Sequence, residues 1–213
     1  MVSEELILPF YLWILVIVIN FVCGIILLKR TFKIDIEVTK KYYGGITLVC
    51  FTHGIARIFY FIYDFIFPTE LLWWTLGAFV GIICMVIFIF VVETTIYTKT
   101  KHFFTIFGLI GLGLIVVDMI FQLNLTHIIQ IVVGLIIALI IVIIYLYVTI
   151  KSDGIVRKAF IIMIIGIIFL LLGQIGHTPT AHELFPWTVF VAPIMMLLSF
   201  ILFYISMTLY YLK

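Results

Sequence analysis

Seven long runs of apolar residues fill most of the 213-residue chain, and they constrain its fold more than any other feature. A helix needs roughly 20 mainly apolar residues to cross the hydrocarbon core of a bilayer, and each run meets or approaches that length. A membrane-spanning strand would instead alternate apolar and polar residues over about ten positions. The sequence therefore predicts an all-α, seven-helix bundle, forming one transmembrane domain over residues 1–213, with helices at about 7–28, 43–66, 72–97, 103–122, 128–150, 159–176 and 187–209.

The composition also predicts an integral, multi-pass protein of the cell membrane. Hydrophobic residues make up 66% of the sequence and charged residues 10%, which is far from the balance of a water-soluble domain. The first residues, MVSEEL, are acidic where a signal peptide would be basic. We therefore expect the first apolar run to stay attached as a helix.

The basic residues predict the orientation of the helices. Lys and Arg cluster between expected helices 1 and 2, 3 and 4, and 5 and 6, whereas the other connections contain none. The positive-inside rule then places the N-terminus outside and the C-terminus in the cytoplasm. The net charge of +2 is spread over the inner connections and forms no groove-binding run, so no nucleic-acid partner is expected.

The second expected helix carries polar residues where lipid-facing residues would be usual. Four side chains at the spacing i, i+4, i+7, i+11 share one stripe of this helix: His53, Arg57, Tyr60 and Asp64. Burying the Arg57 cation costs roughly 2.5–3.5 kcal/mol on insertion scales, so a partner is expected. Asp118 reaches a similar depth in the fourth helix and is the first candidate counter-ion, and Asp64 is the second. Such a pair would either only specify the packing of the bundle or line a polar pocket.

Further polar residues gather at the predicted outer end of the bundle. His127 and Gln130 share one face of the fifth helix, and Gln174 lies near the end of the sixth. The candidate ligand-binding residues are therefore His53, Arg57, Tyr60, Asp64, Asp118, His127, Gln130 and Gln174.

Glu93 lies about one turn from the inner end of the third expected helix, within VVETTIYTKTK. It is either an interface carboxylate paired with Lys99 or Lys101, or a switch whose partner changes between two states. The same helix contains GAFVG, a GxxxG motif that permits close approach of a neighbouring helix.

The sequence contains no motif of soluble-enzyme chemistry: no Gly-rich phosphate loop, no nucleophile elbow and no HExxH. The three cysteines form no CxxC pair, so neither a disulfide framework nor a thiolate metal site is expected. No metal ligand, cofactor or catalytic residue is predicted. We also find no pair of Gly/Pro-broken helices at matching positions in two halves, which is the usual pointer to a secondary transporter.

The whole-chain topology, the ARIFYFIYD stripe and the ETTIYTKTK helix end resemble the seven-helix sensory modules of prokaryotic receptors. Those modules usually carry a cytoplasmic output domain, and we expect this chain to have none. Retinal proteins share the topology but need a Schiff-base lysine in the last helix, and residues 187–209 contain no lysine. The resemblance implies a sensor without retinal that signals through a separate partner.

Two hypotheses of different classes follow. The first is a sensor or receptor-like protein that binds an unknown small ligand in a polar pocket of its outer half and acts through a partner in the membrane or cytoplasm. The alternative is a small transporter or an ion or proton pathway that uses the buried charges as a relay. An intramembrane enzyme is less expected, because it would need a metal or nucleophile that the sequence does not show.

Overall fold

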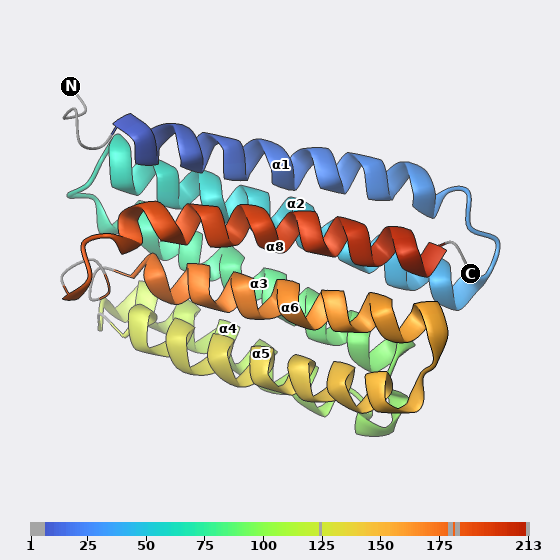
Figure 1. Cartoon of the computed structure of the whole chain (residues 1–213). Coiled ribbons are helices and arrows are strands. Elements are labelled where there is room, and N and C mark those ends of the chain that lie inside the picture. The colour runs from blue at the N-terminus through green and yellow to red at the C-terminus, as the bar shows by residue number, and fades with distance from the viewer. Residues whose placement is uncertain (1–6, 124, 179–180, 182–183, 212–213) are drawn as a thin grey trace. The chain divides into compact units, whose positions relative to one another are not determined.

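A computed structural model describes residues 7–123, 125–178, 181 and 184–211 of the chain. These residues form helices and no strand, and seven of the helices are long and apolar enough to cross a membrane. They are α1 (Ile7–Thr31), α2 (Glu37–Phe65), α3 (Leu71–Thr95), α4 (Phe103–Phe121), α5 (Thr126–Lys151), α6 (Gly154–Gly176) and α8 (Thr188–Tyr211), drawn in Figure 1. A short 3-10 turn, η2 (Thr98–Thr100), lies between α3 and α4. The prediction of seven helices of membrane-spanning length is confirmed.

Two helices begin earlier than their apolar runs predict. α2 begins at Glu37 instead of near residue 43, and α6 begins at Gly154 instead of near residue 159. Hydropathy marks the segment suited to hydrocarbon, whereas the helical backbone continues into the charged flank. In α2 this flank contains an ion pair between Lys41 Nζ and Glu37 Oε1 at 2.7 Å, the i, i+4 spacing that stabilises an exposed helix.

The chain packs as two compact units. One unit contains the chain up to Cys23 and from Val142 onward, and the other contains Gly24–Ile141. The continuous helices α1 and α5 therefore contribute to both units.

In the first unit, α6 and α8 lie side by side (Figure 1). The Ser206 hydroxyl donates a hydrogen bond to the Ala159 carbonyl oxygen at 2.8 Å and so ties the two helices together. Small residues allow the approach: a Cβ added to Gly173 would lie 2.6 Å from Met196 Cγ. In the absence of a hydrophobic force between helices in lipid, such close packing is a main source of association.

In the second unit, α3 packs against both α2 and α4. Gly45 of α2 faces Val91 of α3, and a Cβ added at Gly45 would lie 2.9 Å from Val91 Cβ and closer still to its methyl groups. The side chain of Cys84 on α3 donates to the Val49 carbonyl oxygen of α2 at 3.4 Å. This unit contains every predicted site residue except Gln174.

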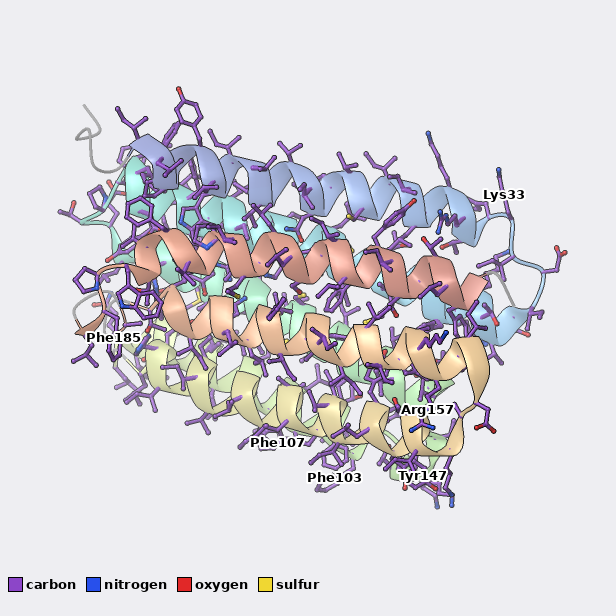
Figure 2. The ribbon with its side chains drawn as sticks, in the orientation of Figure 1. Lys33, Phe103, Phe107, Tyr147, Arg157 and Phe185 are labelled. Atoms are coloured by element: carbon purple, nitrogen blue, oxygen red, sulfur yellow. The ribbon has the colours of Figure 1, made fainter. Side chains whose placement is uncertain are left out.

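Large apolar side chains project outward along the helices (Figure 2). For example, Phe103 at the start of α4 is 66% exposed and points outward in Figure 2. The charged residue Lys33, in contrast, lies outside the helices, in the α1–α2 connection. Exposed apolar surface of this extent is typical of a chain whose solvent is lipid, where the helical backbone satisfies its own hydrogen bonds.

The contact between Gly45 and Val91 gives a first prediction. Gly45→Ala should destabilise the detergent-purified protein by about 1–3 kcal/mol, because the added methyl overpacks a short, β-branched neighbour. Gly134→Ala on α5 is the matched control, since nothing lies within 4 Å of its added Cβ. Thermal unfolding should show a loss for the first variant and no loss for the second. Equal unfolding temperatures would contradict the α2–α3 contact.

Candidate functional site

The polar stripe of α2 is buried within the chain. His53 is 3% exposed, Arg57 1% and Tyr60 3%, and Asp64 is half-buried. Arg57 Nε donates to His53 Nε2 at 3.5 Å, and its guanidinium lies 5.0 Å from the centre of the Tyr60 ring. The helical spacing therefore brings together the side chains that the sequence places on one stripe.

Arg57 is surrounded by polar side chains of two helices. The charge of Asp64, seven positions along α2, acts on it, and the Cys84 thiol of α3 lies within electrostatic reach as well. A buried cation is costly unless polar groups and an opposite charge compensate it. The charge of Asp64, the second candidate in the sequence analysis, thus acts on Arg57, and its role as counter-ion stays a prediction.

Tyr60 connects the stripe to two neighbouring helices. Its ring packs on Gly77, where an added Cβ would lie 3.0 Å from ring carbons, and its hydroxyl is 4.0 Å from the equivalent position of Gly81. These are the two glycines of the predicted GxxxG motif, so the close approach expected there is made by an aromatic side chain. The Gln130 amide of α5 donates to the Tyr60 hydroxyl oxygen at 2.6 Å.

An aromatic group extends this cluster toward the start of α5. The Trp74 ring of α3 meets Tyr60 edge-on at 6.2 Å between ring centres, and it lies 5.4 Å from the ring of His127. His127 and Gln130 are both half-buried. The structure therefore brings His53, Arg57, Tyr60, Asp64, His127 and Gln130 into one polar and aromatic cluster of the second unit.

The expected pair of Arg57 and Asp118 is wrong. The Asp118 carboxylate accepts hydrogen bonds from the backbone N–H groups of Leu125 and Thr126, each at 2.8 Å, and from the Thr126 hydroxyl. First-turn N–H groups have no partner within their own helix, and they favour an anion. Asp118 therefore caps α5. The prediction failed because it compared only the depths of Arg57 and Asp118 along their helices, and depth does not determine the direction of a side chain.

The expected pairing of Glu93 with Lys99 or Lys101 is also wrong. The buried Glu93 carboxylate accepts from the backbone N–H of Phe104 at 3.2 Å and of Thr105 at 2.9 Å, and from the Thr105 hydroxyl. It caps the first turn of α4 in the way that Asp118 caps α5. The two lysines are exposed, and the unsatisfied N–H groups of α4 offer the carboxylate a better-defined site.

Gln174 lies half-buried on α6 in the other unit, and the structure does not assign it to the cluster around Arg57. Among the described residues, no three His, Cys, Asp or Glu side chains are grouped to hold a metal ion. Cys23, Cys50 and Cys84 are buried, and none of them forms a disulfide with another described residue.

Sequence reasoning missed Trp74 and the two capping threonines, Thr105 and Thr126. The signal for the threonines is visible in retrospect: each acid stands near the end of one helix, and a threonine stands at the start of the next. The cue for Trp74 is weaker, because a tryptophan near a helix end also suits the membrane interface. No family model, curated protein or solved structure matches this chain.

The capping role of Asp118 can be tested by a double-mutant cycle. Asp118→Ala and Thr126→Val should be coupled by about 0.5–3 kcal/mol, because the two side chains share a hydrogen bond. Asp118→Ala and Arg57→Leu should instead add to within about 0.3–0.5 kcal/mol. The measurement is the free energy of unfolding of each variant in detergent. Strong coupling between residues 57 and 118 would restore the ion pair and contradict the cap.

Proposed function

We propose that this protein is a seven-helix membrane sensor that binds a small ligand at the polar cluster around Arg57 and acts through a separate partner. The ligand carries an anionic group such as a carboxylate, which contacts the Arg57 guanidinium. The proposed site consists of His53, Arg57, Tyr60, Asp64, His127 and Gln130.

The observation that carries this proposal is the burial of Arg57, on which the charge of Asp64 acts, in a helix apolar enough to cross a membrane. Glu93 and Asp118 have a structural task as helix caps. Asp64 differs from them, because its charge acts on Arg57. An ionisable group within a membrane segment is rare and usually marks a ligand or ion pathway.

The Tyr60 contacts offer a route by which binding alters the bundle. Tyr60 touches the Arg57 guanidinium, the α3 glycines and Gln130 of α5. An anion that competes with Asp64 for Arg57 would shift the guanidinium and, with it, the Tyr60 ring. Three helices would then respond to one local change in charge pairing.

For the orientation, we propose an external N-terminus and a cytoplasmic C-terminus in the cell membrane. The support is the placement of Lys and Arg in alternate connections. In this orientation the cluster of Asp64, Trp74 and His127 lies toward the outside, where an external ligand would enter.

The ligand proposal predicts opposite effects for two substitutions. A panel of small carboxylates should contain compounds that raise the unfolding temperature of the purified protein, because a ligand that binds only the folded state stabilises it. Arg57→Gln should abolish the rise, whereas Asp64→Asn should lower the Kd by removing the competing carboxylate. Asp118→Asn is the control and should leave the Kd unchanged. Stabilisation that persists in Arg57→Gln would contradict the site.

A flux measurement separates the sensor from a transporter. Proteoliposomes containing the protein should bind the stabilising carboxylate saturably and should show no movement of that compound or of protons across the bilayer. Flux that disappears in Arg57→Gln would favour the alternative of a transporter or proton pathway.

The orientation can be tested by cysteine labelling in intact cells. The native cysteines are buried, so an impermeant thiol reagent should report only an introduced residue. Thr69→Cys in the α2–α3 connection should react from outside, and Lys33→Cys in the α1–α2 connection should react only after the membrane is opened. The reverse pattern would invert the proposed topology.

A further inference from the structure

Both ends of α4 are held by the same arrangement of atoms. At the start of α4, one oxygen of Glu93 accepts the N–H of Phe104, and the other accepts both the N–H and the hydroxyl of Thr105. Past the end of α4, one oxygen of Asp118 accepts the N–H of Leu125, and the other accepts both donors of Thr126. In each case an acid near the end of one helix binds the first turn of the next.

The same two connections contain the strained backbone of the described chain. Three residues other than glycine have positive φ there: Lys101 at 49°, His102 at 65° and Gln122 at 52°. Left-handed backbone brings the Cβ of an L-residue too close to a carbonyl oxygen, and such strain persists only where surrounding contacts impose it. Lys101 and His102 are consecutive, so the α3–α4 connection carries the larger strain.

We propose that the α3–α4 connection is a conformational latch, in which the Glu93 carboxylate holds the first turn of α4 against the strain of Lys101 and His102. In the latched state Glu93 binds Phe104 and Thr105. In the released state these hydrogen bonds are broken, and the two left-handed residues relax. The latch is independent of ligand binding at Arg57.

Three features suit this connection to a switch. Lys99, Lys101 and His102 are exposed, so a partner can reach the segment. The latch consists of one side chain, so its opening does not require the α3–α4 packing to separate. The strain of the closed loop partly offsets the free energy of its hydrogen bonds, which brings the two states closer together.

The backbone N–H groups of Phe104 and Thr105 report the latch directly. They belong to the first turn of α4 and therefore have no partner within the helix, so their protection from hydrogen exchange depends on Glu93. In Glu93→Gln, a neutral amide with one acceptor oxygen replaces two charged acceptors. We expect exchange at residues 104 and 105 to rise about tenfold or more, the factor that corresponds to 1.4 kcal/mol.

Asp118→Asn is the matched control at the other end of α4. It should raise exchange at Leu125 and Thr126 and leave residues 104 and 105 protected. If Glu93→Gln does not yield folded protein, Thr105→Val provides the same test, because it removes one hydrogen bond to the same carboxylate. Unchanged exchange at residues 104 and 105 in the folded variant would overturn the latch. A uniform rise along α3 and α4 would do so too, because it would make Glu93 a stabiliser of the whole fold.

The strain has its own test. His102→Gly should slow exchange at Phe104 and Thr105, because glycine adopts positive φ without a steric penalty. Lys99→Gly lies in the adjacent 3-10 turn, where φ is not positive, and should speed the exchange by adding flexibility alone. Faster exchange in both variants would show that no strain opposes the latch, and the proposal would fail.

Discussion

A helix that starts at the edge of a bilayer has first-turn N–H groups that neither its own backbone nor hydrocarbon can satisfy. In this chain two carboxylates meet that need: Glu93 for α4 and Asp118 for α5. Each links consecutive helices through a threonine that donates both its backbone N–H and its hydroxyl. The arrangement of α3, α4 and the start of α5 depends on these two side chains, and so does the interpretation of the remaining buried charges.

Once Glu93 and Asp118 are assigned to helix ends, the two charged residues in the stripe of α2 stand apart. Arg57 and Asp64 share a stripe with His53 and Tyr60, and the Tyr60 hydroxyl is tied to Gln130. Burying a cation there costs free energy. Apolar residues in place of both Arg57 and Asp64 would suit the packing of apolar helices better. The presence of Arg57 in this position is therefore the main support for the proposed ligand site, and the contacts of Tyr60 would connect that site to α3 and α5.

The sequence was sufficient for the helices and for local neighbours, and insufficient for partners across helices. Apolar runs predicted seven segments because hydrocarbon thickness sets their length, and helical spacing predicted the His53–Arg57–Tyr60 stripe because it depends on one helix alone. The pairing of Arg57 with Asp118 failed because depth along an axis does not determine the direction of a side chain. The helix caps were missed because the acid and its threonine are eight to twelve residues apart, across a turn. The left-handed backbone at Lys101 and His102 has only a weak sequence signature, since neither residue is glycine and histidine is only modestly suited to positive φ.

The division of the carboxylates of Glu93, Asp118 and Asp64 into two helix caps and one group whose charge acts on Arg57 is most directly tested by carbon-13 NMR of the labelled carboxyl groups. The substitution Arg57→Leu should shift the carboxyl resonance of Asp64, because it removes the neighbouring positive charge, and should leave those of Glu93 and Asp118 in place. A shift at Asp118 with no change at Asp64 would contradict the assignment and return Asp118 to the role of partner for Arg57.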